Sequence, residues 1–245
     1  MKRTRTLLRR ILGGLAAALL LAVCAFVIYA GVYYRADPAA LAALPADLVV
    51  TASPGGRFTT LTPPQPNGTG LVFYPGAKVE ANAYLPLLAR FCEKGYTCVL
   101  VSMPLRFAFL DAGAADVACN QSPGVARWYL AGHSLGGAMA SAYMARHPGR
   151  FAGLILMGAY VYGDVPAERT LVLYGSADGL LNRSKLTGGS NEVCLEGGNH
   201  AQFGNYGAQK GDGIATISRE EQQVLTVEKA AAFMAQAQDP QEGKE

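Results

Sequence analysis

The sequence predicts an α/β fold, a three-layer α/β/α sandwich around a mainly parallel sheet, preceded by one N-terminal transmembrane helix. Apolar runs of four to seven residues alternate with helical stretches of about a dozen, the pattern of a parallel sheet covered on both faces. Gly and Pro clusters separate many of these stretches. In addition, the 24 residues from Ile11 to Tyr34 contain no charged side chain, which predicts the transmembrane helix.

The N-terminal region divides into a basic segment (1–10), an apolar segment (11–34) and an Ala- and Pro-rich linker (35–47). A helix over 11–34, at about 1.5 Å per residue, is long enough to cross a hydrocarbon core of about 30 Å. Five basic residues precede it and only Arg35 follows closely, so we expect a cytoplasmic N-terminus and an extracytoplasmic domain over 48–245. A cleaved signal peptide is the alternative, but the apolar run exceeds the ~7–15 residues usual for one. We therefore expect an uncleaved signal-anchor in the cell membrane.

The charge distribution argues against a nucleic-acid partner. The whole chain carries +3, but residues 1–35 hold six of the 21 basic residues and none of the 18 acidic ones. Residues 36–245 therefore carry 15 basic and 18 acidic side chains, or −3. A domain of this charge lacks the basic surface that nucleic acids require.

The first expected elements of the domain are strands. Leu48–Ala52 and Arg57–Thr62 flank the turn cluster Ser53–Gly56, which is typical of two paired strands. Thr69–Tyr74 is a short apolar run that ends at Pro75-Gly76. These runs predict three strands before the first helix of the domain.

Helices and strands then alternate to the end of the chain. Ala81–Lys94 has apolar residues at helical spacing until Gly95, Tyr96–Ser102 is a buried type of strand, and Leu105–Ala118 is a weaker helical pattern. The remaining expected strands and helices are, in order, the strand Arg127–Ala131, the helix Leu135 to about Arg146, the strands Phe151–Met157, Thr170–Tyr174 and Glu192–Leu195, and the amphipathic helix Arg219–Ala237.

The strongest chemical signal is Gly132-His133-Ser134-Leu135-Gly136, a G-x-S-x-G pattern between an expected strand and an expected helix. A serine hydroxyl is a poor nucleophile, so it must be held clear of the backbone and beside a base. A sharp strand-to-helix turn exposes it in this way, and crowding at the turn favours glycine two residues to either side. Ser134 is therefore the predicted nucleophile.

The base follows by elimination, because the sequence contains three histidines. His133 adjoins the serine on the tight turn and cannot face it productively, and His147 stands at an expected helix end. His200 lies in a glycine-rich loop after the last expected strand. In an α/β domain this position, beyond the nucleophile, is the one expected for the base, so we assign the role to His200.

An acid should orient the histidine and stabilise its cation. Asp178 lies at the C-terminal end of an expected strand, where open parallel sheets bind ligands. Its place between Ser134 and His200 gives the chain order expected for this architecture. Asp164, after the preceding strand, remains a competitor, whereas Asp212 comes after the histidine and breaks the order.

The oxyanion hole needs two N–H donors. The first turn of the helix after Ser134 supplies the N–H of Leu135, near the positive end of the helix dipole. The second should come from the loop after the third strand, where Gly76 permits a tight backbone and Ala77 presents its N–H.

These motifs together resemble the α/β-hydrolase superfamily, particularly its small bacterial members without a cap domain. The resemblance covers roughly residues 48–237, and the matching active-site loops are 73–79, 103–105, 132–137 and 197–204. It implies an eight-stranded sheet and a carboxylesterase that needs no cofactor or metal, transferring an acyl group from an ester to serine and then to water. Only Tyr160–Arg169 stand where larger members insert a cap, which suits small or polymer-borne esters. The pocket walls would then be Met103, Phe107, Phe109 and Phe203.

Two other functions share these sequence features. An acyltransferase or a peptidase would use the same triad with a different acceptor or acyl donor. A non-catalytic binding domain would keep the fold, but such a domain usually lacks a triad residue, and this sequence has all three. The cysteines fit no zinc pattern. We expect one local disulfide between Cys92 and Cys98, and the alternative is that the cysteines are buried as small apolar side chains.

Overall fold

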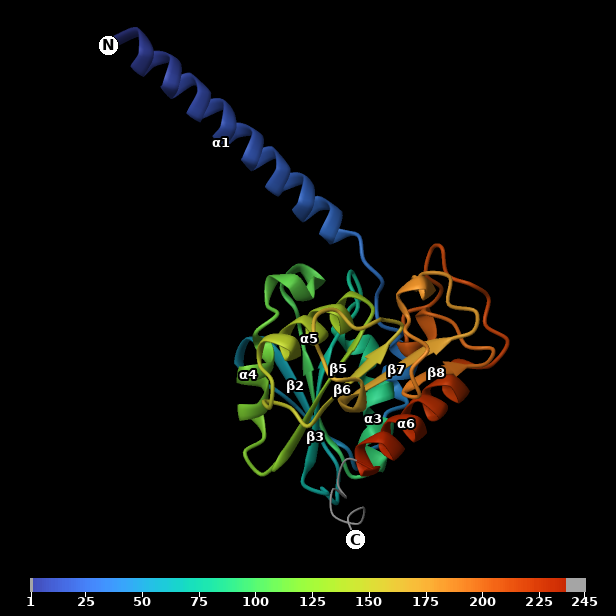
Figure 1. Cartoon of the computed structure of the whole chain (residues 1–245). Coiled ribbons are helices and arrows are strands. Elements are labelled where there is room, and N and C mark those ends of the chain that lie inside the picture. Colours follow the sequence, from blue (N-terminus) through green and yellow to red (C-terminus); the bar gives the residue numbers. More distant parts are fainter. Residues whose placement is uncertain (1, 237–245) are drawn as a thin grey trace. The chain divides into compact units, whose positions relative to one another are not determined.

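The computed structural model describes residues 2–236, and the chain divides into two units, Met1–Tyr33 and Tyr34–Glu245. The first unit is dominated by the helix α1 (Lys2–Gly31), shown in blue in Figure 1. Its part from Arg10 to Gly31 is long and apolar enough to cross a membrane, and a signal sequence would have the same properties.

The second unit is built on an eight-stranded, mostly parallel sheet, as the sequence predicts. Its order is β1-β2-β4-β3-β5-β6-β7-β8, and only the pairs β1–β2 and β2–β4 are antiparallel. The strands are β1 (Val49–Ala52), β2 (Phe58–Thr62), β3 (Thr69–Tyr74), β4 (Thr97–Val101), β5 (Arg127–His133), β6 (Gly153–Met157), β7 (Thr170–Gly175) and β8 (Glu192–Leu195). The interior strands β3, β4 and β6 are buried along their whole length, as continuous apolar runs in a covered sheet should be.

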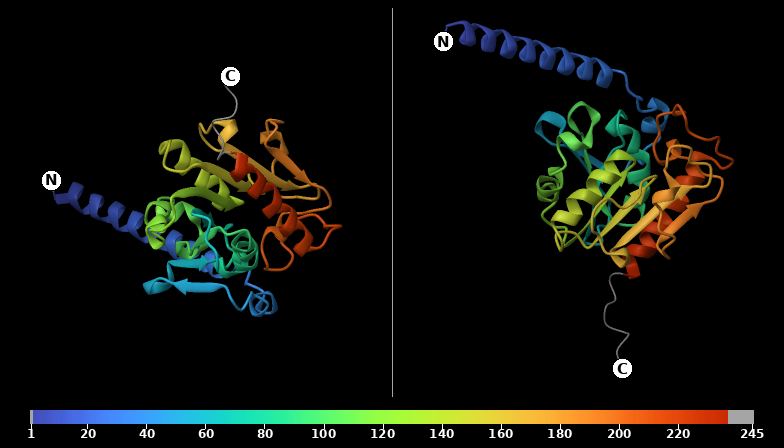
Figure 2. Two further views of the ribbon diagram at one scale, coloured as in Figure 1. Left: turned by 90° about the horizontal axis from the view of Figure 1, so that it is seen from below. Right: turned by 45° about the horizontal axis from the view of Figure 1, so that its top comes forward.

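Helices cover both faces of the sheet and complete the sandwich (Figures 1 and 2). One apolar core joins the sheet to α3 (Leu85–Glu93) and α6 (Arg219–Gln236), with Phe91 and Phe233 among its buried side chains. The other joins the opposite face to α4 (Ala114–Ala118) and α5 (Leu135–Arg146), with Tyr143 fully packed. The parallel strands therefore end together at one edge, where their loops assemble the site.

The expected helix over Leu105–Ala118 is wrong, because the chain there is broken into three short pieces. The 3₁₀ turns η3 (Pro104–Arg106) and η4 (Ala108–Leu110) precede α4. Leu105 and Arg106 have φ angles of 48° and 63°, which a right-handed helix cannot contain. The apolar residues in this stretch are therefore arranged by tertiary contacts and not by a helical period.

The expected linker over 35–47 is part of the folded domain. It contains α2 (Pro38–Ala42), and the Asp37 carboxylate accepts a hydrogen bond from the Ala39 N–H to cap that helix. Leu41 and Leu44 pack against the α3 and α6 core. The Ala- and Pro-rich composition suggested a spacer, but its few apolar side chains are enough to hold it to the domain.

The expected disulfide is also absent, since all five cysteines are free thiols. Cys92 on α3 and Cys98 on β4 are both buried. The Cys92 thiol donates to the Leu61 carbonyl and the Cys98 thiol to the Leu88 carbonyl, at 3.6 and 3.7 Å. The short turn through Gly95 brings the two thiols near one another, but both pack in the core as small apolar side chains.

Candidate active site

The G-x-S-x-G pattern forms a sharp turn between β5 and α5. Ser134, the residue at the turn, has φ 52° and ψ −125°, a strained conformation for a residue that is not glycine. A Cβ on Gly132 would lie 2.6 Å from the backbone of Gly136, and one on Gly136 would collide with the carbonyl oxygens of Tyr74 and Pro75. Both glycines are therefore required by backbone packing, as the sequence predicts.

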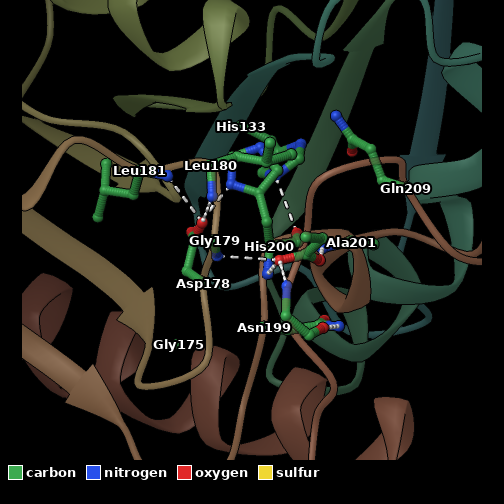
Figure 3. Close-up of polar contacts among 12 residues, drawn as sticks. His133, Gly175, Asp178, Gly179, Leu180, Leu181, Asn199, His200, Ala201 and Gln209 are labelled. Carbon is green, nitrogen blue, oxygen red and sulfur yellow. Dashed lines mark hydrogen bonds and ion pairs between the residues drawn. The ribbon is translucent and has the colours of Figure 1, made fainter.

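The predicted base and acid lie in contact in the loops that follow β8 and β7. The His200 Nδ1 lies 2.9 Å from Oδ2 of Asp178, and the two side chains are 2% and 0% exposed. The other carboxylate oxygen, Oδ1, accepts from the backbone N–H groups of Leu180 and Leu181 at 2.9 and 2.8 Å (Figure 3). These contacts fix the carboxylate, and the carboxylate in turn fixes the plane of the imidazole.

The protonation state of the pair follows from these contacts. Burial alone would raise the pKa of Asp178, but the hydrogen bond and charge of His200, with the two backbone N–H groups, set it below its ordinary value of 3.8. Asp178 is therefore an ionised carboxylate that can only accept, so His200 Nδ1 must carry the hydrogen. The lone pair of a neutral His200 is left on Nε2.

Ser134 and His200 both line a pocket of about 230 Å³ at the carboxyl ends of the strands. His200 Nε2 is buried and has no hydrogen-bond partner among the described residues. The pocket walls are mainly small or apolar: Leu135, Ala138, Gly158, Ala159, Tyr160, Leu180, Leu181 and Asn182 complete the lining. His200 and Ser134 thus line the same pocket, and no hydrogen bond joins His200 Nε2 to the serine.

The predicted walls Met103, Phe107, Phe109 and Phe203 are not among the residues that line this pocket. Phe203 is fully buried and packs against His133, with their ring centroids 5.6 Å apart. Phe107 and Phe109 pair with each other at 5.3 Å, and Met103 lines a separate groove of about 400 Å³. Hydrophobicity identified these residues, but it does not distinguish a buried core from a pocket wall.

Only one of the two predicted oxyanion donors lines the pocket. Leu135 lines the pocket and begins α5, whose first N–H groups have no partner within the helix. Ala77 lies in the loop after β3 and is outside the pocket lining. The loop around it is fixed, because the Lys78 N–H donates to the Arg106 carbonyl at 3.0 Å.

The candidates that the sequence argument set aside lie elsewhere or act differently. His147 ends α5 and donates from Nδ1 to the Tyr143 carbonyl at 2.9 Å, as a helix-end residue should. Asp164 is exposed. His133 is buried and uses both ring nitrogens, bonding Tyr84 and the carbonyl of His200.

Asp212 has a role that the sequence argument missed. Its carboxylate accepts from the backbone N–H groups of Gly179, His200 and Gly213 through Oδ1, and from Ala201 through Oδ2. Gly179 follows the acid and His200 is the base, so one carboxylate fastens the two loops together. A chain-order rule cannot reveal such a contact, although the pair of glycines around Asp212 marks a tight turn.

Gly158 is the second residue that was missed. It follows β6 with φ 54°, and a Cβ there would lie 2.8 Å from Nδ1 of His200 and 3.2 Å from Oδ2 of Asp178. Only glycine leaves room for this pair of side chains. Its signal in the sequence is a glycine placed directly after a fully buried strand.

The described residues contain no group of three or more His, Cys, Asp or Glu side chains arranged to hold a metal ion. The arrangement as it stands offers a strained serine, an oriented imidazole and free N–H groups at a helix start. Together these groups can carry out nucleophilic acyl transfer.

Comparisons with known proteins agree with this architecture. Residues 70–224 match the model of a family described as the alpha/beta hydrolase family. A protein of Mycobacterium phage D29, provisionally described as a non-heme haloperoxidase, is 33% identical over 103 residues; the match spans 38% of this chain and 37% of that relative. Among solved structures, TT1662 from Thermus thermophilus has a TM-score of 0.56 at 15% identity over 79% of this chain and 99% of its own. Est1E from Butyrivibrio proteoclasticus has 0.53 at 12% over 78% and 100%. Such low identities establish the fold alone.

Proposed function

This chain belongs to the alpha/beta hydrolase family, and from that membership we propose that it is a serine hydrolase, specifically a carboxylesterase acting through Ser134, His200 and Asp178. One observation carries the proposal. His200 is oriented by an ionised carboxylate on Nδ1, while its unpartnered Nε2 is buried beside the pocket that Ser134 also lines. A base with one nitrogen fixed and the other vacant next to a strained serine is arranged to accept the serine proton.

The reaction follows from the two nitrogens. The Ser134 hydroxyl attacks the ester carbonyl carbon as its proton passes to His200 Nε2, and Asp178 stabilises the resulting imidazolium. The Leu135 and Ala77 N–H groups stabilise the negative oxygen of the tetrahedral intermediate. The imidazolium then gives its proton to the departing alcohol, and water, activated by the same nitrogen, releases the acid from the acyl-enzyme.

The pocket favours a small acyl group. Its volume is about 230 Å³ and most of its lining side chains are apolar or small. Residues 158–169 between β6 and β7 contain only the short 3₁₀ turn η6 (Ala167–Arg169), so no helical cap covers the site from this segment. The proposed substrates are therefore small esters or esters carried on a polymer.

A fluorophosphonate probe, which reacts with activated serines, tests the proposal on the full-length protein in detergent. We expect labelling at Ser134, no labelling of Ser134→Ala, and strongly slowed labelling of His200→Ala. Failure of the wild-type protein to react would favour a binding domain. Hydrolysis of p-nitrophenyl esters, with competing alcohols and matched amides, separates an esterase from an acyltransferase and a peptidase.

We also propose that α1 anchors the enzyme with its N-terminus in the cytoplasm and the catalytic domain outside it. The support is the length and apolar character of Arg10–Gly31 together with the basic residues before it. The full-length protein should fractionate with membranes, and protease added to spheroplasts should digest the domain. A soluble exported form beginning near Gly31 would instead identify a cleaved signal peptide.

A further inference from the structure

His133 stands next to the nucleophile but has no part in the proton transfer described above. Its side chain is buried, and both ring nitrogens are engaged. Nδ1 lies 2.8 Å from the Tyr84 hydroxyl, and Nε2 lies 3.1 Å from the carbonyl oxygen of His200. Figure 3 shows the His133 ring directly above the loop that carries His200.

The hydrogen bonds from Gly76 through Tyr84 and His133 to His200 form one series, and their directions follow from the His200 carbonyl and from the neutral state of His133. At one end, the Gly76 N–H donates to the Tyr84 oxygen at 3.1 Å. At the other, the His200 carbonyl can only accept. The Nε2–H of His133 therefore donates to the His200 carbonyl, and on a neutral His133 the lone pair on Nδ1 accepts from the Tyr84 O–H.

These directions require a neutral His133 with its hydrogen on Nε2, because Nδ1 accepts a hydrogen bond only when it carries no hydrogen. Burial, and then the nearby His200, lowers the pKa of His133 well below its ordinary value of 6.5. Burial raises the pKa of Tyr84 from its ordinary value, so the phenol keeps its hydrogen. Tyr84 and His133 thus keep the protonation states that this series of hydrogen bonds needs.

This series of hydrogen bonds joins three loops that approach the site from different strands. Gly76 precedes Ala77 in the loop after β3, His133 ends β5 beside Ser134, and His200 follows β8. Aromatic packing reinforces it: the His133 ring centroid is 4.4 Å from that of His200 and 5.7 Å from that of Tyr84. The space is full, since a Cβ on Gly76 would lie 2.8 Å from Nδ1 of His133.

We propose that Tyr84 and His133 are positioning residues, which hold the loop of the oxyanion donor Ala77 and the loop of the base His200 in fixed relation to Ser134. This inference rests on the proposed hydrolase function and adds to it. Asp212 accepts from the N–H of His200 at 3.1 Å, so with the contact from His133 the peptide groups on both sides of the base are held by side-chain hydrogen bonds.

Three substitutions each remove different hydrogen bonds of this series. Tyr84→Phe keeps the ring and removes both hydrogen bonds of the hydroxyl. His133→Gln keeps a donor at the place of Nε2 and removes the hydrogen bond with Tyr84, whereas His133→Asn keeps an acceptor at the place of Nδ1 and removes the hydrogen bond with His200. Tyr129→Phe is the matched control, because Tyr129 is also fully buried and donates to the Met234 carbonyl at 3.2 Å, away from the site.

We expect Tyr84→Phe and His133→Asn to lower kcat by about 10- to 100-fold, the effect of displacing reacting groups by about an ångström. KM should stay within about threefold, because none of the hydrogen bonds that these variants remove is made to the ester. Tyr84→Phe combined with His133→Gln should lower kcat little more than the more damaging of the two single substitutions, because both remove the same hydrogen bond. Tyr129→Phe should lower the melting temperature without lowering kcat.

Rates must be measured per active serine, counted by titration with the fluorophosphonate probe, so that a poorly folded fraction does not count as a slow enzyme. A Tyr84→Phe enzyme with wild-type kcat per titrated serine would overturn the proposal, as would additive effects in the double variant. If Tyr84→Phe does not fold, His133→Gln and His133→Asn give the same decision. Failure of the proposed function is distinct, because the wild-type protein would then not react with the probe.

Discussion

Gly158→Ala tests whether the acid–base pair needs the space that a missing side chain leaves. The new Cβ would lie 2.8 Å from Nδ1 and 3.0 Å from Cε1 of His200, and 3.2 Å from Oδ2 of Asp178. Ordinary contact begins near 3.4 Å, so the imidazole must move by more than half an ångström or the backbone after β6 must shift. A displacement approaching 1 Å in a catalytic group lowers rates by about 10²-fold. We therefore expect kcat/KM to fall by about two orders of magnitude.

The same substitution also strains the backbone, and a second glycine isolates that effect. Gly158 has φ 54°, and an alanine in this region costs about 1–2 kcal/mol. Gly149, in the turn that follows α5, has φ 90° and nothing within 4 Å of an added Cβ. Gly149→Ala should therefore lose similar stability in thermal unfolding while kcat/KM stays within about twofold of wild type.

Ester hydrolysis and thermal unfolding, measured on both variants and on wild type, decide the question. The reasoning would be refuted if Gly158→Ala kept kcat/KM within about threefold of wild type while it folded. It would also fail if Gly149→Ala lost as much activity as Gly158→Ala, because backbone strain would then explain the result without any contact with His200.

Four further expectations follow from the site and the domain boundary. Ser134→Ala and His200→Ala should each lower kcat/KM by about 10³-fold or more, and Asp178→Asn by less than Ser134→Ala; near wild-type hydrolysis by His200→Ala contradicts the assignment. Asp212→Asn turns an acceptor toward backbone N–H groups into a donor, so melting temperature and kcat should both fall; an unchanged kcat would show that Asp212 does not position the base. His133 is neutral in the folded protein, but in the unfolded chain its imidazole gains a proton near pH 6.5. The free energy of unfolding should therefore fall below that pH, by up to about 1.4 kcal/mol per pH unit. Urea titrations at pH 7 and 5.5 should show a smaller fall for His133→Gln than for the wild-type protein. A chain beginning at Tyr34 should fold. One beginning at Leu48 should be less stable by several kcal/mol, because the apolar packing of residues 34–47 against the core is then missing. Equal melting temperatures of the two shortened proteins would restore the interpretation of residues 35–47 as a linker.

The sequence predicts those parts of the site that depend on short-range pattern. The turn at Ser134 is encoded within five residues, because its glycines are demanded by backbone contacts inside and beside the turn. The pairing of Asp178 with His200 follows from chain order, since parallel strands bring their carboxyl ends to one edge. The strands of the sheet are predicted by the alternation of short apolar runs with helical stretches along the sequence.

The remaining features depend on contacts between residues that are distant in sequence. Asp212 was considered only as a rival acid, because nothing in its neighbourhood indicates that it accepts from the N–H groups of two other loops. Phe203 is apolar and near His200 in sequence, and only the fold shows that it is buried against His133 and does not line the pocket. The predicted helix over 105–118 is wrong, because the amino-acid composition of this stretch does not indicate the positive φ angles at Leu105 and Arg106.

The way in which the chain enters the domain has a mechanical consequence. Tyr34 donates its N–H to the Lys78 carbonyl at 2.8 Å and accepts from the Glu80 N–H at 2.9 Å, and its hydroxyl accepts from the Lys210 N–H at 3.1 Å. These bonds lie in the loop that carries Ala77 and in the segment that follows His200. A pulling force applied ahead of Tyr34 would therefore load these two segments first, before the sheet. Stretching single molecules from this end should abolish turnover at forces that leave the core folded.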